Sequence, residues 1–211
     1  MPALLTFDIF GTVVDWRRGL EAALRAEGIA PAPGDFDRTI DLQAALEQER
    51  FRPYREITAR SLVAALGVPQ EAADRIGAAV GTWPLYPDAR EGLRRLQALA
   101  PCAAMTNSDR AHGEQARAQL GFPLAAWVCA EDLGFYKPNP EFWRAVAARL
   151  GVEPSPAWWH VSAYADYDLD AAAGLGLTTV FVERPHARPG PATHRVRDLG
   201  ELADLAEGLQ T

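Results

Sequence analysis

The sequence predicts an α/β protein built on a parallel sheet, with a helical segment inserted near its start. Three observations lead to this fold class. A short apolar strand opens the chain and ends at Asp8, residues 16–87 then show helical periodicity without a strand candidate, and from Asp88 onward strands and helices alternate. Alternation of this kind implies parallel strands joined by right-handed crossovers.

The first strand is expected over residues 4–7, an apolar run with one β-branched and one aromatic residue. It places Asp8 at the carboxyl end of the strand, where open α/β sheets carry their ligand sites. A buried carboxylate there costs free energy unless backbone N–H groups or a cation hold it. Gly11 lets the following backbone approach closely, and Thr12 adds a hydroxyl. From this stretch alone, a turn cap is an equal alternative for Asp8.

The inserted segment is expected to be entirely helical. Its four helices are expected at residues 16–27, 36–51, 53–66 and 70–80. Proline-rich loops separate them from the rest, and the two prolines at 84 and 87 mark the return to the main domain. The expected organisation is a core of residues 1–15 and 88–211 with a helical subdomain of residues 16–87. At 211 residues, one large domain is the alternative.

The second half is expected to hold the other strands, at residues 102–106, 127–130, 158–162 and 178–182. Helices are expected at residues 88–99, 110–120, 140–150, 169–175 and 199–209, the last closing the sheet. Residues 184–193, with three prolines and a glycine, are expected to form a surface loop. Because the carboxyl ends of parallel strands meet at one edge, polar residues at 106–108, Lys137 and residues 162–168 are expected to converge with Asp8.

The composition is acidic and shows no membrane or secretion signal. A net charge of −7 and a pI near 5.1 argue against sequence-independent nucleic-acid binding, which needs a basic face. There is no apolar run of about 18 residues and no signal peptide, so we expect no membrane contact and a cytoplasmic location. Cys102 and Cys129 lie in apolar runs and are expected to be structural. The four histidines show no metal spacing, and none is placed as a catalytic base.

Four motifs follow the strands in a distinctive order. They are Phe-Asp-Ile-Phe-Gly-Thr at residues 7–12 with Asp15, Met-Thr-Asn at 105–107, Tyr-Lys-Pro-Asn-Pro at 136–140, and Asp168 ahead of Ala-Ala-Ala-Gly-Leu-Gly at 171–176. With these motifs, the chain resembles the haloacid dehalogenase (HAD) superfamily over essentially its whole length. The resemblance implies a Rossmann-like core with a helical cap inserted just after the first strand.

The resemblance also implies roles for the residues at the sheet edge. Asp8 would be the nucleophile, forming a covalent ester that water then hydrolyses. Lys137, the only lysine of the chain, would hold Asp8 ionised. Asp168, with Lys137, would activate the water. Thr12 would supply a catalytic hydroxyl. Thr106 and Asn107 would position the substrate or the ester oxygens.

Two departures from the superfamily's phosphatases indicate the branch. Phosphatases carry a second aspartate as general acid two residues after the nucleophile, where this chain has Phe10, and a phenyl ring transfers no proton. They also present a Gly-Asp pair where this chain has Ala163. An aromatic residue followed by Gly-Thr resembles instead the (S)-2-haloacid dehalogenase branch, which needs neither metal nor acid. We therefore expect no cofactor; the alternative is Mg²⁺ held by Asp8 and Asp168.

The dehalogenase pattern is itself only partly present. Those enzymes bind the halide or the substrate carboxylate with an arginine from the cap, for which Arg38 is the nearest candidate and Arg52 and Arg55 are alternatives. Trp143 stands in place of a tyrosine, so the aromatic wall is kept and the hydroxyl is lost. The further substrate-binding residues expected from the resemblance are Phe10, Arg38, Trp143, Ser162 and Tyr164.

The leading hypothesis is a metal-independent hydrolase of the 2-haloacid dehalogenase type. Its partner would be a small-molecule substrate, a short carboxylic acid, which Asp8 attacks by SN2 displacement. A Mg²⁺-dependent phosphatase with an atypical acid is the first alternative. A catalytically degenerate binding protein of the same fold is the second, and the intact Asp8 and Lys137 argue against it. Dimers formed through the cap or the first core helix are common among relatives, which leaves a homodimer open.

Overall fold

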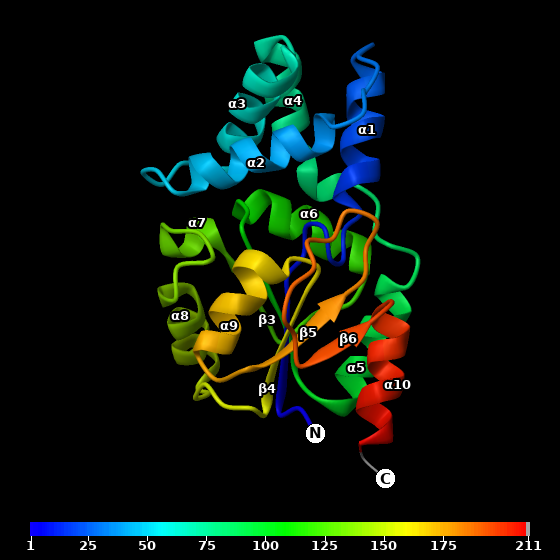
Figure 1. The fold of residues 1–211 in the computed structure, drawn as a ribbon, viewed down its shortest axis with the longest axis vertical. Coiled ribbons are helices and arrows are strands. Elements are labelled where there is room, and N and C mark those ends of the chain that lie inside the picture. Colours follow the sequence, from blue (N-terminus) through cyan, green and yellow to red (C-terminus); the bar gives the residue numbers. More distant parts are fainter. Residues whose placement is uncertain (210–211) are drawn as a thin grey trace.

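The computed structural model describes residues 1–209 as a parallel sheet flanked by helices, with further helices beyond one edge (Figure 1). The strands are β1 Leu4–Phe7, β2 Cys102–Thr106, β3 Ala126–Cys129, β4 Trp158–Ser162, β5 Thr178–Val182 and β6 His194–Val196. The α-helices are α1 Trp16–Ala26, α2 Asp35–Glu47, α3 Tyr54–Leu66, α4 Gln70–Ala78, α5 Ala89–Leu99, α6 Arg110–Leu120, α7 Ala130–Leu133, α8 Glu141–Leu150, α9 Asp170–Gly174 and α10 Leu199–Gly208. A 3₁₀ turn at Val80–Thr82 and a π-helical turn at Ala165–Leu169 complete the secondary structure.

Within residues 1–209, six strands run parallel in the order β3-β2-β1-β4-β5-β6. The chain first moves outward from β1 to β3 and then crosses back to β4 on the other side of β1. The direction of winding therefore reverses at β1, and ligands of open α/β sheets bind at such a switch point. Asp8 follows β1 directly, which puts it at this point. The predicted α/β class is confirmed.

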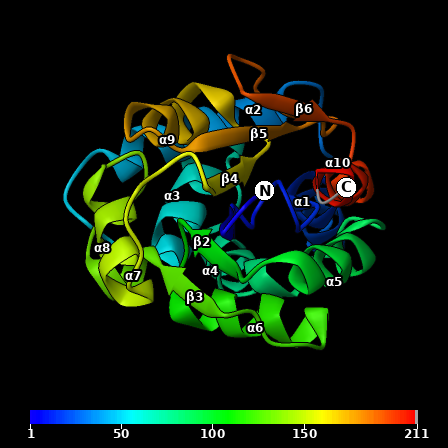
Figure 2. The same cartoon turned by 90° about the horizontal axis from the view of Figure 1, so that it is seen from below.

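The helices cover both faces of the sheet and one of its edges. Figure 2 shows α5 and α6 on one side of the sheet and α8 and α9 on the other, and α10 packs against α5. Helices α1 to α4 gather beyond the carboxyl ends of the strands (Figure 1), with α2 packed on α3 and α3 on α4. We propose residues 16–87 as the cap on this arrangement.

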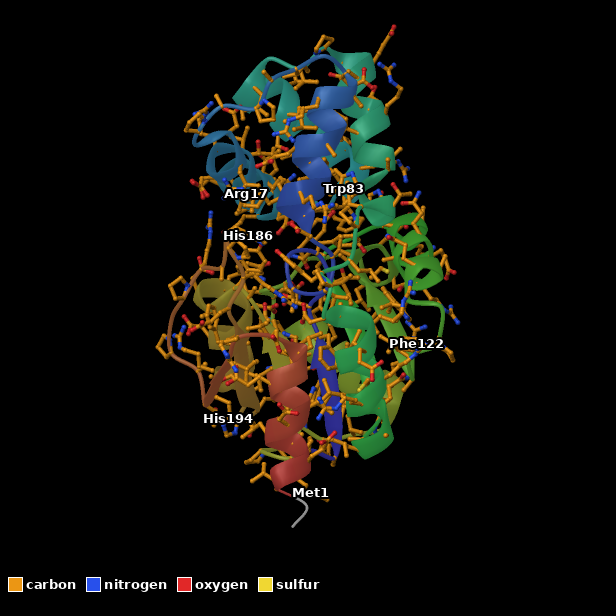
Figure 3. All side chains as sticks on the ribbon, turned by 90° about the vertical axis from the view of Figure 1, so that its right-hand side faces the viewer. Met1, Arg17, Trp83, Phe122, His186 and His194 are labelled. Atoms are coloured by element: carbon orange, nitrogen blue, oxygen red, sulfur yellow. The ribbon has the colours of Figure 1, made fainter. Side chains whose placement is uncertain are left out.

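Aromatic packing fastens the base of α1 to the chain that returns to the core. The Trp16 and Trp83 rings meet edge to face with centroids 5.3 Å apart, and both are buried. Trp83 lies at the junction between the upper helices and the core in Figure 3. Gly19 leaves the space that this ring fills, since a Cβ there would lie 2.3 Å from the Trp83 ring. The side chain of Asp15 caps α1 by accepting from the Arg18 amide at 3.0 Å.

Two short elements are absent from the sequence prediction, and the helices expected at residues 36–51 and 70–80 end earlier, at Glu47 and Ala78. The edge strand β6 and the short helix α7 were not predicted, because segments of three and four residues are too short to show a periodicity. The segment predicted as a surface loop is also partly buried: the Arg184 side chain bonds to both carboxylate oxygens of Asp88 at 2.8 and 2.9 Å. Each helix within residues 1–209 falls short of the length and apolarity that crossing a membrane requires.

Candidate active site

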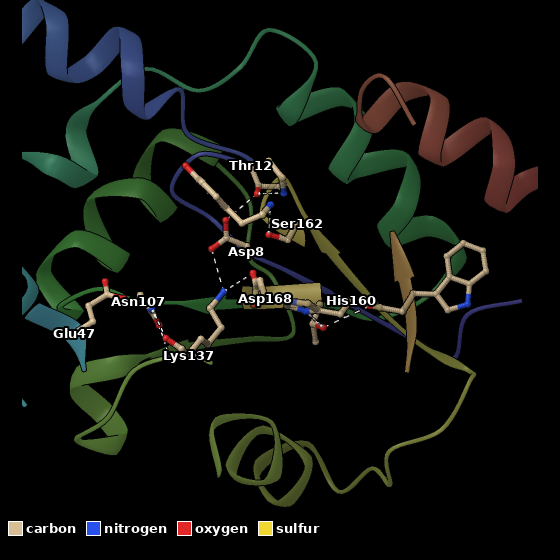
Figure 4. Close-up of polar contacts among 12 residues, drawn as sticks. Asp8, Thr12, Glu47, Asn107, Lys137, His160, Ser162 and Asp168 are labelled. Atoms are coloured by element: carbon tan, nitrogen blue, oxygen red, sulfur yellow. Dashed lines mark hydrogen bonds and ion pairs between the residues drawn. The ribbon is translucent and has the colours of Figure 1, made fainter. Parts of the chain in front are cut away.

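Asp8 is a buried carboxylate held on both of its oxygens. Its Oδ2 accepts from the Thr12 hydroxyl at 2.8 Å and its Oδ1 from Lys137 Nζ at 3.1 Å (Figure 4). The Asp8 amide donates to the Val161 carbonyl of β4 at 3.0 Å, so the backbone is fixed at the end of the sheet. Thr12 Oγ1 accepts in turn from the Ala163 amide at 2.9 Å, which directs its proton to Asp8.

A glycine makes the turn between Asp8 and Thr12 possible. Gly11 has φ +100°, a conformation that side chains other than hydrogen disfavour. A Cβ at Gly11 would lie 2.4 Å from the hydroxyl of Tyr164. The turn and the aromatic ring packed over it therefore require glycine at this position.

Lys137 joins the two carboxylates of the site. Its Nζ donates to Asp8 at 3.1 Å and to Asp168 Oδ2 at 2.9 Å, and its side chain is fully buried. Asn107 positions the lysine backbone by accepting from the Lys137 amide at 2.8 Å and donating to its carbonyl at 3.0 Å. The structure thus brings together the four strand-end residues that the sequence predicted to converge.

His160 is a buried partner of the site that the sequence analysis did not assign. Its Nε2 lies 3.0 Å from Asp168 Oδ1 and its Nδ1 lies 2.9 Å from the Thr6 hydroxyl. Trp158 Nε1 donates to that same hydroxyl at 2.7 Å. Since an ionised carboxylate only accepts, we assign the His160 proton to Nε2. Thr6 and His160 are register partners on β1 and β4, a relation that appears only once the strands are paired.

The surroundings shift the pKa values of Asp168 and Asp8 in opposite directions. Burial would raise the pKa of Asp168, but Lys137 and the His160 N–H outweigh burial and hold it below its ordinary value. Burial raises the pKa of Asp8, and Lys137 only partly opposes this effect. Asp8 is consequently the more basic of the two carboxylates, and a more basic carboxylate is the stronger nucleophile once it is ionised.

A cavity of about 550 Å³ opens in front of Asp8, between the carboxyl ends of the strands and helix α2. Four predicted substrate-binding residues line it with Asp8 and Lys137: Phe10, Thr106, Asn107 and Tyr164. The Thr106 hydroxyl is buried and has no hydrogen-bond partner among the described residues. It is therefore a donor left free for a ligand in the cavity.

Three predicted substrate contacts lie outside the cavity lining. Arg38 is on the outer side of α2, ion-paired with Asp35 and more than half exposed. Trp143 is fully buried and packs edge to face on His160 at 5.6 Å, so its ring supports the histidine. Ser162 Oγ accepts from the Tyr164 amide at 3.1 Å and orders the backbone after β4. Their assignment as direct substrate contacts is corrected by these positions.

The alternative cap arginines are engaged elsewhere. Arg52 pairs with Glu49 at 2.8 Å and Arg55 with Asp109 at 3.3 Å, and neither lines the cavity. The Asp109 carboxylate also accepts from the backbone N–H of Arg55 at 3.1 Å, which ties the start of α3 to the core. These arginines have structural contacts instead of a place at the cavity wall.

Glu47, the last residue of α2, is a cavity carboxyl that sequence reasoning missed. Its Oε2 accepts from Asn107 Nδ2 at 3.0 Å, a contact between the cap and the core (Figure 4). Burial raises the pKa of Glu47 to about 8, although the Asn107 bond and the nearby Lys137 charge lower it. This environment favours the neutral form of the Glu47 carboxyl. No pattern in the sequence shows which face of α2 turns toward the cavity.

The donor set does not fit a magnesium ion. Both oxygens of Asp168 are taken, one by Lys137 and one by His160, and the Lys137 ammonium lies between Asp168 and Asp8. Mg²⁺ prefers several oxygen ligands in an octahedral array. Within residues 1–209, no cluster of three or more His, Cys, Asp or Glu side chains is arranged to hold a metal ion.

The buried Asp8–Lys137 pair lies at the carboxyl ends of the strands. This is the arrangement that the resemblance to the HAD superfamily implies. A family model described as haloacid dehalogenase-like hydrolase matches residues 2–174, and the chain belongs to this family. The chain is 32% identical over 139 residues to (S)-2-haloacid dehalogenase 4A of Burkholderia cepacia, a match that covers 63% of this chain and 59% of that protein. It is 28% identical over 127 residues to (S)-2-haloacid dehalogenase 1 of Pseudomonas sp. (strain CBS-3), covering 57% and 55%. These matches span less than two thirds of either relative's length.

Solved structures share the whole architecture. The L-2-haloacid dehalogenase PA0810 superimposes with a TM-score of 0.83 at 26% identity, covering 99% of both chains. The L-2-haloacid dehalogenase from Xanthobacter autotrophicus with chloropropionic acid covalently bound has a TM-score of 0.82 at 20% identity and covers 99% of this chain and 100% of that one. At that identity the second comparison shows the fold alone.

Proposed function

We propose that the protein hydrolyses a short 2-halogenated carboxylic acid through a covalent ester on Asp8. The observation that carries the proposal is the state of Asp8: its carboxylate faces the cavity, one oxygen held by Lys137 and the other by Thr12. Phe10, the residue two positions on, offers no proton. A nucleophile without an acid at this position suits a leaving group that needs no proton from it. The names of the curated relatives agree with a halide.

In the first step, an Asp8 oxygen attacks C2 of the substrate from the side opposite the halogen. The C–O bond forms as the carbon–halogen bond breaks, and halide leaves with the bonding pair. No proton is transferred, because halide is a weak base. We assign to the Thr106 hydroxyl, which lines the cavity without a hydrogen-bond partner among the described residues, a hydrogen bond to an oxygen of the substrate or of the ester.

In the second step, water attacks the ester carbonyl of Asp8 and the 2-hydroxy acid departs. We assign the stabilisation of the oxyanion that forms on Asp8 to Lys137. Asp168, whose two oxygens are bonded to Lys137 and His160, holds this lysine in place and is a weak base for the water. The leaving alkoxide takes up a proton, the Asp8 carboxylate is restored, and one proton is released to solvent overall. The reaction as proposed uses no metal or organic cofactor.

The experiment measures chloride release from (S)-2-chloropropionate by protein treated with EDTA. p-Nitrophenyl phosphate is the competing substrate, each assay is repeated with added Mg²⁺, and Asp8→Asn is the control. We expect chloride release that survives EDTA and disappears in Asp8→Asn. Phosphate-ester hydrolysis that requires Mg²⁺, without chloride release, would show that the protein is a phosphatase despite Phe10.

Isotope labelling distinguishes the ester mechanism from direct attack by water. In a single turnover in H₂¹⁸O, with enzyme in excess, the label enters the Asp8 carboxylate if water attacks the ester carbonyl. If water attacks C2 directly, the label appears in the 2-hydroxy acid. Mass spectrometry of the peptide containing Asp8 reads the result.

A further inference from the structure

Among the described residues that line the cavity, one cation is left for an anionic substrate. Among the described lining residues, the acidic side chains are Asp8, Glu47, Glu49 and Asp166, and the basic ones are Lys137 and Arg188. Lys137 is fully buried and already bonded to Asp8 and Asp168. A substrate carboxylate that took this lysine would break the pair that holds the nucleophile. The carboxylate of a short acid therefore needs another partner.

The backbone of Arg188 is fixed beside the site, although it lies in the connection between β5 and β6. Its amide donates to the Ala163 carbonyl at 2.9 Å, and its carbonyl accepts from the Ala165 amide at 2.8 Å. The two bonds pair Arg188 with Tyr164, the residue that packs over the turn after Asp8. The guanidinium therefore starts from a rigid position at the cavity wall.

The present partners of the Arg188 guanidinium are weakly held. It contacts Asp41 on α2, and Asp166 Oδ2 lies 3.6 Å away. The Asp41 side chain is 67% exposed and that of Asp166 is 46% exposed. Ion pairs between exposed side chains contribute little net free energy, so water or another anion replaces either carboxylate easily. Asp41 in particular can rotate into solvent without leaving a buried charge.

We propose that Arg188 binds the carboxylate of the substrate, which displaces Asp41 from the guanidinium. A planar guanidinium can meet a carboxylate with two parallel N–H···O bonds, a geometry that a lysine does not offer. The inference rests on the proposed function, and it assigns carboxylate recognition to the core side of the cavity. Asp41 is then a competitor for the same cation, placed on the cap.

The test compares Arg188→Met, Arg188→Lys and Asp41→Asn with the wild-type protein. For (S)-2-chloropropionate, we expect Arg188→Met to raise KM about tenfold or more with little change in kcat. Arg188→Lys restores part of the affinity because it keeps the charge without the planar fork. Asp41→Asn lowers KM by about twofold to fivefold, because the competing carboxylate is gone. Arg144→Met, which removes an exposed arginine paired with Glu141 outside the cavity, is the matched control.

Two further readouts separate this inference from the proposed reaction. Turnover of 2-chloropropionamide, which lacks the carboxylate, is expected to be the same in Arg188→Met and wild type. Binding of unreactive (S)-lactate, measured by calorimetry, is expected to weaken in Arg188→Met and to tighten in Asp41→Asn whether or not halide is released. Absence of chloride release from every variant, with Arg188-dependent lactate binding, would refute the reaction and keep the inference.

The inference is overturned if wild type releases chloride and its KM is the same in Arg188→Met. It is also overturned if Arg38→Met raises KM and Arg188→Met does not, which would return the role to the cap arginine. Failure of wild type to bind lactate at all would equally refute it. Thermal unfolding of each variant accompanies the assays, and Asp41→Asn gives a gain in affinity that a misfolded protein cannot produce.

Discussion

His160 Nε2 lies 3.0 Å from Oδ1 of Asp168, and both side chains are fully buried. The contact leaves Asp168 with one oxygen for His160 and one for Lys137. Such a carboxylate stays ionised and keeps a fixed orientation beside Asp8. The histidine therefore acts on the site through Asp168 and is a positioning residue.

Replacing His160 is expected to reveal this role. His160→Leu leaves a buried Asp168 oxygen without a donor, so the free energy of unfolding should fall by about 2–3 kcal/mol. The kcat for chloride release should fall while KM stays the same, because no substrate contact is lost. His160→Gln supplies an N–H near the same place and should recover part of both quantities. Urea unfolding and steady-state kinetics make the measurement, and equal effects of Leu and Gln would contradict the assignment.

The turn at Gly11 provides a test of how closely the site is packed. Gly11→Ala is expected to lower the free energy of unfolding by about 3 kcal/mol, because φ is +100° and the new methyl would lie 2.4 Å from the Tyr164 hydroxyl. Activity should fall as well, since Thr12 is displaced from Asp8. Thermal and urea unfolding measure the loss.

Gly174→Ala is the matched control for that substitution. Gly174 lies in α9 with no heavy atom within 4 Å of a Cβ, so alanine should be neutral or stabilise by about 1 kcal/mol. Equal stability of the two variants would show that the space over Gly11 is not constrained.

The strand-end residues could be predicted because their position depends on local rules. An apolar run of four or five residues predicts a strand, and parallel strands bring their carboxyl ends to one edge. These two rules bring together Asp8, Thr106 and the segment that leads to Lys137. Their detailed roles came from the motifs, and the roles remain proposals.

The residues that were missed or misplaced depend on tertiary relations. His160 could not be assigned, because its partner Thr6 is 154 residues away and adjacent only through strand pairing. Arg38 was expected at the cavity, but the rotation of α2 turns it outward to Asp35. Arg184 and Arg188 lie in a Pro-rich segment that the sequence indicates as a loop, yet the fold turns both inward. Burial of a charged residue leaves no periodic signal in a loop.

Glu47 is expected to make stability depend on pH. Its pKa in the folded protein is raised to about 8 by burial, above the ordinary value of 4.5 that applies to the unfolded chain. Between these values the folded state binds the proton more tightly, so the contribution of Glu47 to stability is complete below about pH 4.5 and is lost as the pH rises to about 8. Glu47→Gln removes this dependence.

The measurement is the difference in melting temperature between Glu47→Gln and wild type at several pH values. We expect the variant to gain on wild type steadily from pH 5 to pH 8.5, with a near-zero difference at the acidic end. A difference that is the same at every pH would show that Glu47 is solvated and titrates normally.

Lys137→Met tests whether the lysine holds two buried carboxylates apart. Without the ammonium, repulsion between Asp8 and Asp168 raises the pKa of Asp8 further above its unfolded value. At pH 7.5 the free energy of unfolding should fall by about 3–5 kcal/mol, and chloride release should cease. The deficit should shrink toward pH 5, because a carboxyl with a raised pKa in the folded state is stabilised as it gains a proton.

The double variant Lys137→Met/Asp8→Asn removes one of the two charges and should be more stable at pH 7.5 than Lys137→Met alone. Urea unfolding at both pH values reads the result, and a deficit that is independent of pH and unrelieved by Asp8→Asn would mean that Lys137 acts through packing and not through its charge.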